Sequence, residues 1–156
     1  PYVDMTLALM AQFGVEVERD GYRRFRVARG QRYRGRVYAV EADASSAHYF
    51  LAAAALTGGA VRVPGVGRAS LQGDVHFADV LERLGAEVRW EDDAITVRGG
   101  AGLAGGDVDM NAISDTSMTL ATLAPFARAP LRIRNVSHIR LQESDRIAAV
   151  TTELRK

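Results

Sequence analysis

The chain has 156 residues, of which 47% are hydrophobic and 25% are charged, and its formal net charge at pH 7 is +1. This composition is ordinary for a globular domain with a real core, and the balanced charge gives no reason to expect nucleic acid or an anionic membrane as a partner. The absence of cysteine excludes a disulfide framework, a thiolate metal site and a cysteine nucleophile within the chain, and suits a reducing compartment such as the cytoplasm.

The N-terminal part predicts a helix, a hairpin and a linker. Residues 5–13 have the apolar spacing of a helix, and residues 15–17 and 25–27 alternate as the strands of a hairpin. Residues 28–36 are rich in Arg, Gly and Gln, which is typical of a linker. Residues 38–40 then predict a short strand that leads into the next unit.

The middle of the chain predicts one complete structural unit. Its elements are, in order, a buried Ala-rich helix, a strand, an amphipathic helix and a hairpin, at residues 45–56, 60–63, 73–84, and 87–90 with 95–97. Gly58 and Gly85 are suited to the left-handed backbone that ends a helix. With the strand at residues 38–40, the unit has the order β-α-β-α-β-β.

The C-terminal part predicts the same order of elements again. A strand, a helix, a second strand and a second helix are expected at residues 108–110, 116–127, 131–133 and 143–155. Val61 and Val63 fall on Leu131 and Ile133 when the sequence is shifted by about seventy residues. Such self-similarity identifies a repeat, in which each unit buries its apolar face against the next.

The repeat predicts an α/β fold of mixed character, built from β-α-β-α-β-β units. One copy is complete, the first copy lacks its front half and the third stops at residues 154–156, so we expect a chain truncated at both ends. We expect residues 1–41 to be the end of one domain, formed by a partial repeat and a linker. Residues 42–156 should be the first part of a second domain, with one complete and one truncated repeat.

The densest cluster of charge, Glu143–Arg146, stands at the predicted start of the last helix. Residues i and i+3 of a helix share a face, so the side chains of Glu143 and Arg146 would lie together. The Glu143 carboxylate could then move a proton while the Arg146 guanidinium holds an anion. The alternative is a helix cap with a surface ion pair, which stabilises a helix without any catalytic role. The middle copy has Gly73 and His76 at these positions.

Asp115 opens the preceding predicted helix, where its carboxylate would face backbone N–H groups and the positive end of the helix dipole. This environment keeps a carboxylate ionised and able to accept a hydrogen bond from a substrate hydroxyl. The alternative is a simple N-cap. Asp43 has the same kind of position in the middle copy, without a Glu/Arg cluster after it, and we expect it to be a structural cap.

The remaining motifs give weaker signals. We expect His48, which lies in the Ala-rich helix, to be a packing residue, and His76 to lie on a helix surface. His138 lies in the loop before Glu143. The three histidines are too far apart in sequence to suggest a metal site, and no phosphate loop or dinucleotide fingerprint is present. We therefore expect no metal and no cofactor. No apolar run approaches the roughly 20 residues of a membrane span.

Several segments, taken together, resemble one known family. Residues 40–54, which include Asp-Ala-Ser-Ser-Ala-His, residues 74–81 and the tail Arg-Leu-Gln-Glu-Ser-Asp-Arg at residues 140–146 resemble EPSP synthase (3-phosphoshikimate 1-carboxyvinyltransferase). Residues 1–4 are similar to a turn that contacts substrate in this family. The resemblance covers the whole chain, in the correct order and without a large gap.

The resemblance implies a fold and a reaction. The family is built from six β-α-β-α-β-β units, three in each of two domains that close over the substrates. Its reaction, in aromatic amino-acid biosynthesis, transfers the enolpyruvyl group of phosphoenolpyruvate to the 5-hydroxyl of shikimate 3-phosphate and releases phosphate. This chain would be a central segment of such a transferase. We expect it to be inactive without complementary segments of the same enzyme, and a monomer when complete.

The resemblance also implies catalytic roles for the charged cluster. Asp115 would hold and deprotonate the attacking hydroxyl of shikimate 3-phosphate. Glu143 would exchange a proton with the methylene carbon of phosphoenolpyruvate, and Arg146 would bind the charged groups of that substrate.

Three further positions would contact shikimate 3-phosphate by resemblance: Tyr2, His138 and Gln142. The family usually has Lys where this chain has Gln142, and often Asn where it has His138. A glutamine still hydrogen-bonds a hydroxyl but supplies no charge against an anionic substrate.

Two alternatives stand beside this interpretation. A UDP-sugar enolpyruvyl transferase has the same fold, although the Glu-Ser-Asp-Arg tail and the Asp-Ala-Ser-Ser segment favour the shikimate enzyme. The second alternative is a repeat module without catalytic activity, which Gln142 and the expected truncation would fit.

Overall fold

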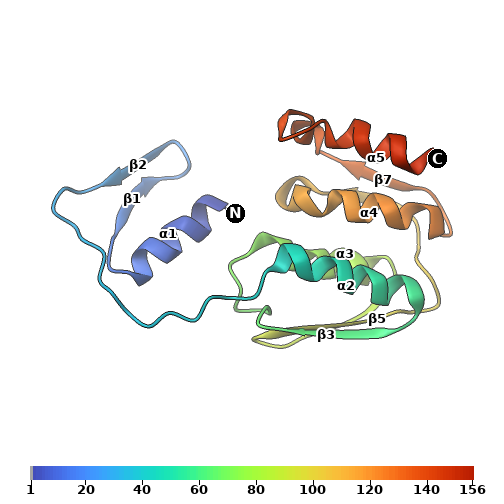
Figure 1. Cartoon of the computed structure of the whole chain (residues 1–156), viewed down its shortest axis with the longest axis horizontal. Coiled ribbons are helices and arrows are strands. Elements are labelled where there is room, and N and C mark those ends of the chain that lie inside the picture. The colour runs from blue at the N-terminus through green and yellow to red at the C-terminus, as the bar shows by residue number, and fades with distance from the viewer. Residues whose placement is uncertain (1) are drawn as a thin grey trace. The chain divides into compact units, whose positions relative to one another are not determined.

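The computed structural model describes residues 2–156, which form two compact units divided after Val40 (Figure 1). The first unit contains one helix and one hairpin: α1 (Tyr2–Gln12), β1 (Val17–Asp20) and β2 (Arg24–Val27). The second unit contains the other helices and strands: α2 (Ala44–Thr57), β3 (Ala60–Pro64), α3 (Phe77–Arg83), β4 (Glu87–Trp90), β5 (Ala94–Arg98), β6 (Gly106–Asp109), α4 (Ser117–Leu123), β7 (Leu131–Arg134) and α5 (Arg146–Leu154).

The first unit is small and largely exposed. Strands β1 and β2 pair antiparallel, with Val17 opposite Val27. Val15 is buried between the helix and the hairpin, and the ring centroids of Phe13 and Tyr38 lie 5.4 Å apart. The expected order of helix, hairpin and irregular linker is confirmed for this unit.

The second unit has two sheets of different kinds. Strands β3, β5 and β4 form an antiparallel sheet in that order, with Val97 of the central strand opposite both Val61 and Val88. Strands β6 and β7 pair in parallel, with Val108 opposite Ile133. Parallel neighbours need a crossover connection, and helix α4 lies between β6 and β7 in the chain.

Helix α2 forms where the sequence predicts it because both of its ends are capped. The Asp43 carboxylate accepts hydrogen bonds from the backbone N–H of Ser45, at 2.9 Å, and from the hydroxyl of Ser46, at 2.6 Å. The helix ends at Gly58, whose left-handed backbone (φ +75°) suits a residue without a Cβ. Asp43 is therefore a structural cap, as expected.

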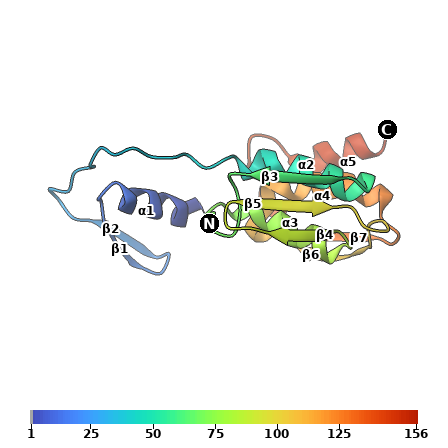
Figure 2. The ribbon, with the colours of Figure 1, turned by 90° about the horizontal axis from the view of Figure 1, so that it is seen from below.

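One apolar core joins the helices to the sheet of the second unit. Helices α2 and α3 cover one face of the β3-β5-β4 sheet (Figure 2), where Leu51, Phe77, Leu81, Ile95 and Val97 are at most 2% exposed. Helix α4 packs on α2 and carries α5 on its other side (Figure 1). Among the described residues, no helix is long and apolar enough to cross a membrane.

Several predicted elements are shorter than their apolar pattern. Residues 38–40, all of them described, form no strand, and Val40 is 83% exposed. The helix predicted at residues 73–84 begins as the 3₁₀ turn Gly73–His76. Helix α4 ends at Leu123, because Pro125 in the following 3₁₀ turn has no backbone N–H to continue the helical hydrogen bonds. Helix α5 begins at Arg146, three residues later than expected.

Residues 2–4, expected in a substrate-contacting turn, lie instead in the first turn of α1. Pro1, which belongs to the same expected turn, lies outside the described residues. The prediction of a turn is therefore wrong for residues 2–4. The apolar spacing of the helix continues further toward the N-terminus than predicted.

Candidate active site

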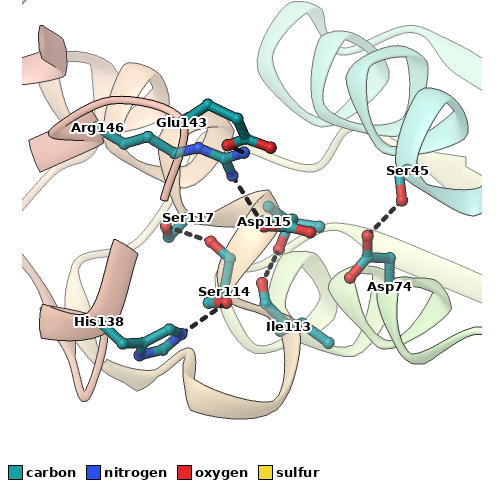
Figure 3. Close-up of polar contacts among 10 residues, drawn as sticks. Ser45, Asp74, Ile113, Ser114, Asp115, Ser117, His138, Glu143 and Arg146 are labelled. Atoms are coloured by element: carbon teal, nitrogen blue, oxygen red, sulfur yellow. Dashed lines mark hydrogen bonds and ion pairs between the residues drawn. The ribbon is translucent and has the colours of Figure 1, made fainter. Parts of the chain in front are cut away.

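Arg146 brings two of the predicted site residues together (Figure 3). Its Nη1 donates to Oδ1 of Asp115 at 2.8 Å, and its Nη2 donates to Oε2 of Glu143 at 2.6 Å. The Arg146 side chain is 26% exposed, that of Asp115 33% and that of Glu143 80%. One guanidinium therefore holds a half-buried carboxylate and an exposed one, and the exposed one is the easier to displace.

The turn that carries Asp115 is held by buried hydroxyl groups. Asp115 lies in the 3₁₀ turn Asn111–Thr116, one residue before the N-cap of α4, so it is not itself the cap that the sequence predicts. The Thr116 hydroxyl donates to the carbonyl oxygen of Ile113 at 2.8 Å, and the Ser117 hydroxyl donates to that of Ser114 at 2.6 Å. Both hydroxyl-bearing residues are buried, so the backbone of this turn has one well-defined arrangement.

The start of α5 corrects the predicted helical pairing of the charged cluster. Asp145, rather than an earlier residue, is the N-cap of α5, and its carboxylate accepts from the N–H of Ala148 at 2.9 Å. Arg140 donates to both oxygens of the Asp145 carboxylate, at 2.8 and 3.1 Å. Glu143 consequently lies in the loop before the helix and meets Arg146 by the bend of that loop. Sequence spacing therefore identified the pair correctly but assigned it the wrong local structure.

The surroundings of Glu143 keep it ionised in this structure. Its own backbone N–H is the first cause that lowers the pKa of Glu143, and the Arg146 guanidinium is the second. Glu143 raises the pKa of Arg146 in turn. An anionic ligand that took Arg146 away from Glu143 would remove the second cause, so the carboxyl group would accept a proton more readily.

His138 and Gln142 lie in the segment that precedes Glu143. His138 lies in the 3₁₀ turn Ser137–Leu141, and its Nε2 is 3.0 Å from the Ser114 hydroxyl oxygen, next to Asp115 (Figure 3). Gln142 is exposed. Ser114 was not singled out from the sequence, although it belongs to the polar run that begins the predicted helix.

Tyr2, the remaining predicted site residue, belongs to the first unit. It lies at the start of α1 and is 57% exposed. The five other predicted site residues all belong to the second unit: Asp115, His138, Gln142, Glu143 and Arg146.

A second polar pair was missed by the sequence interpretation. The Ser45 hydroxyl, at the start of α2, donates to Oδ2 of Asp74 at 2.5 Å, and Asp74 is only 6% exposed (Figure 3). At the shift of about seventy residues, Ser45 corresponds to Asp115. Both copies thus join the beginnings of their two helices by a polar contact, but only the last copy uses an arginine there. No cluster of three potential metal ligands occurs among residues 2–156.

The whole chain matches a known family. The model of EPSP synthase (3-phosphoshikimate 1-carboxyvinyltransferase) matches residues 1–156. The chain is 58% identical over 158 residues to the 3-phosphoshikimate 1-carboxyvinyltransferases of Shewanella sp. (strain ANA-3) and Shewanella baltica (strain OS195). Each alignment covers 100% of this chain and 37% of the relative, so the chain spans a little over a third of the length of these curated relatives.

The structure also resembles that of a solved enzyme. The 2.37 Å structure of EPSP synthase from Acinetobacter baumannii superposes with a TM-score of 0.78 at 24% sequence identity, over 94% of this chain and 35% of that chain. This similarity confirms the predicted enolpyruvyl transferase fold with its mixed α/β units.

Proposed function

Because this chain belongs to the EPSP synthase family, we propose that it supplies one part of the active site of a 3-phosphoshikimate 1-carboxyvinyltransferase. The reaction transfers the enolpyruvyl group of phosphoenolpyruvate to the 5-hydroxyl of shikimate 3-phosphate and releases phosphate. The observation that carries the proposal is the shared guanidinium of Arg146, which joins Asp115 to Glu143. In this proposal Asp115 is the base that takes a proton from the hydroxyl, and Glu143 is the acid that gives a proton to carbon. Arg146 is the cation that binds the anionic substrate.

Asp115 acts on the attacking hydroxyl. The 5-hydroxyl oxygen of shikimate 3-phosphate forms a bond to C2 of phosphoenolpyruvate, and its proton passes to the Asp115 carboxylate. The buried hydroxyls of Thr116 and Ser117 fix the turn that presents this carboxylate. Because the base is already held in position, orienting it during the reaction costs little entropy.

Glu143 and Arg146 act on phosphoenolpyruvate. Arg146 binds the anionic groups of this substrate by exchanging its exposed partner, Glu143. Glu143, relieved of the guanidinium, takes up a proton from solvent and gives it to C3, which forms the tetrahedral adduct. When the adduct collapses, the bond between C2 and the phosphate oxygen breaks and the phosphate leaves with the proton that Asp115 took from the hydroxyl. C3 returns a proton to Glu143.

Three other residues bind shikimate 3-phosphate in this proposal: Tyr2, His138 and Gln142. The hydrogen bond between His138 and Ser114 supports this role, because it holds the imidazole beside the turn that carries Asp115. We also propose that residues 1–41 and 42–156 belong to two different domains of the enzyme. The division of the chain into two compact units after Val40 supports that boundary.

The test is phosphate release from phosphoenolpyruvate and shikimate 3-phosphate, by a protein in which this chain is joined to complementary segments of the same enzyme. Glu143→Gln and Asp115→Asn should each lower kcat by about 10²-fold or more, because each removes one proton transfer. Glu153→Gln, on the exposed surface of α5, is the matched control and should leave kcat unchanged.

Each alternative function has its own signature in the same assay. Phosphate release with a UDP-sugar acceptor, and none with shikimate 3-phosphate, would assign the chain to the other transferase of this fold. If the joined protein released no phosphate with either acceptor, and Gln142→Lys did not restore release, a non-catalytic repeat module would be favoured.

A further inference from the structure

A buried histidine connects the two helices beneath the candidate site. His48 of α2 is 2% exposed and Thr119 of α4 is 6% exposed. The Nε2 atom of His48 lies 2.8 Å from the Thr119 hydroxyl oxygen. This hydrogen bond joins helices that belong to different copies of the repeat.

The pair lies among buried apolar side chains. The His48 ring meets the Phe77 ring edge-on, with centroids 5.5 Å apart, and Leu120 beside Thr119 is fully buried. Two apolar side chains of similar volume would fill such a position without leaving polar groups to satisfy. A buried polar pair is therefore weak evidence for added stability, and it restricts how the two helices pack, because only one register satisfies the hydrogen bond.

The hydrogen bond does not depend on which ring nitrogen of neutral His48 carries the proton. The Thr119 hydroxyl can accept a hydrogen bond from Nε2–H or donate one to a bare Nε2, so either tautomer joins α2 to α4.

Burial lowers the pKa of His48 and is the largest effect on it. The Asp74 carboxylate, the Ala44 carbonyl oxygen and the carboxylates of Asp43 and Asp115 oppose this effect, in that order. These groups belong to the start of α2, to the 3₁₀ turn before α3 and to the turn before α4.

Thr119 lies four residues after Asp115, across the junction of the 3₁₀ turn and α4. Helix α2 contacts both this turn and α4. We propose that His48 is a positioning residue: its hydrogen bond to Thr119 sets the register of α4 on α2, and thereby places the Asp115 carboxylate against Arg146. Its effect on catalysis rests on the proposed function, whereas its effect on Asp115 does not.

The experiment measures the Asp115 carboxyl directly, by ¹³C NMR titration of this chain without substrate. His48→Phe and Thr119→Val each remove the hydrogen bond and keep most of the side-chain volume. Each should raise the Asp115 titration midpoint above that of the parent chain, because a displaced carboxylate pairs less well with Arg146. The double variant should show no more than the larger single shift, because both changes break one contact.

Phe77→Leu is the control for packing alone. This change loosens the packing against the buried His48 ring and leaves the His48–Thr119 hydrogen bond in place. It should therefore lower the urea midpoint of unfolding and leave the Asp115 titration unchanged. An unchanged Asp115 midpoint in folded His48→Phe and Thr119→Val would overturn the proposal and leave His48 as a packing residue. If His48→Phe does not fold, the nearly isosteric Thr119→Val decides alone.

Kinetics of the joined protein separate this proposal from the proposed function. With phosphoenolpyruvate and shikimate 3-phosphate, Thr119→Val should lower kcat by about tenfold with little change in KM, because it misplaces a base without removing a binding group. An inactive parent protein would contradict the proposed function, while the NMR titration would still decide the role of His48.

Discussion

Arg146 is the side chain on which the candidate site depends, because its planar guanidinium reaches two carboxylates in different directions. Asp115 and Glu143 differ in exposure, 33% against 80%, so they do not compete equally with an incoming anion. The equivalent contact of the middle copy, between Ser45 and Asp74, has no cation. The comparison of the two copies therefore favours an anion-binding role for Arg146 over a purely structural one.

Arg146→Lys tests this geometry. An ammonium group keeps the charge but cannot donate in two fixed, coplanar directions, so it cannot hold both Asp115 and an anionic substrate well. We expect the KM for phosphoenolpyruvate in the joined protein to rise by about tenfold or more, which corresponds to about 1.4 kcal/mol. Arg132→Lys, at an exposed position of strand β7, should leave this KM unchanged. Equal KM values for the two variants would contradict the bidentate role.

His48 also predicts how stability depends on pH. Its pKa is lowered in the folded chain, whereas a histidine in the unfolded chain titrates near 6.5. Below pH 6.5 the unfolded state takes up a proton that the folded state refuses, so stability falls as the pH drops toward the folded pKa. The slope approaches about 1.4 kcal/mol per pH unit.

Urea unfolding of this chain between pH 7.5 and 5 measures that slope. Carboxylates with lowered pKa values contribute stability that is lost only at more acidic pH, as the pH falls below their unfolded values near 4. They are Asp4, Asp43, Glu91, Asp109, Glu143 and Asp145. The fall between pH 6.5 and 5 therefore belongs to His48 and should disappear in His48→Phe. The same slope in that variant would assign the effect to other groups.

Among the secondary-structure elements, the hairpin of β4 and β5 shows how a loop is held by close backbone approach. Gly67, after β3, is buried, and the backbone N–H of Arg68 donates to the carbonyl oxygen of Glu91 in the hairpin turn at 2.9 Å. A Cβ at Gly67 would lie 2.5 Å from that oxygen and 2.6 Å from Asp92 O and Ala94 N. Only glycine fits there, because all three contacting atoms belong to the backbone.

Gly67→Ala should therefore destabilise the chain by about 1–3 kcal/mol, the usual cost of overpacking. Gly106→Ala in β6 is the matched control, since its Cβ would meet nothing within 4 Å, and it should be neutral or slightly stabilising. Thermal or urea unfolding of the two variants measures the difference. Equal midpoints would mean that the loop after β3 moves away without cost.

The elements themselves were predictable wherever a cap or a turn marks their ends. Helix α2 lies within one residue of its predicted bounds at each end, because Asp43 and Gly58 mark them. The strand expected at residues 38–40 does not form, since its apolar alternation has no partner strand among the described residues. A strand is a pairing between segments, so local alternation is not sufficient to create one.

For the chain as a whole, the relation to its longer relatives leads to a further prediction. This chain spans 37% of the curated relatives, and the proposed reaction brings two anionic substrates together. Within residues 2–156, Arg146 is occupied by two carboxylates and Arg140 by one. We expect no phosphate release by this chain alone above the uncatalysed rate, and release when complementary segments are supplied. Turnover by the isolated chain would contradict this division of the site.

The sequence alone determined the repeat, the order of most elements, the caps of α2 and the identities of Asp115, Glu143 and Arg146 as candidates. These follow from periodicity, from helix-end chemistry and from motif resemblance, all of which are local in the chain. The tertiary structure decided that Glu143 precedes its helix, that Arg146 also reaches Asp115, and that Ser114 and Thr119 meet His138 and His48. These pairs join residues that are 24–71 positions apart. Their contacts depend on how whole helices pack, which local patterns do not encode.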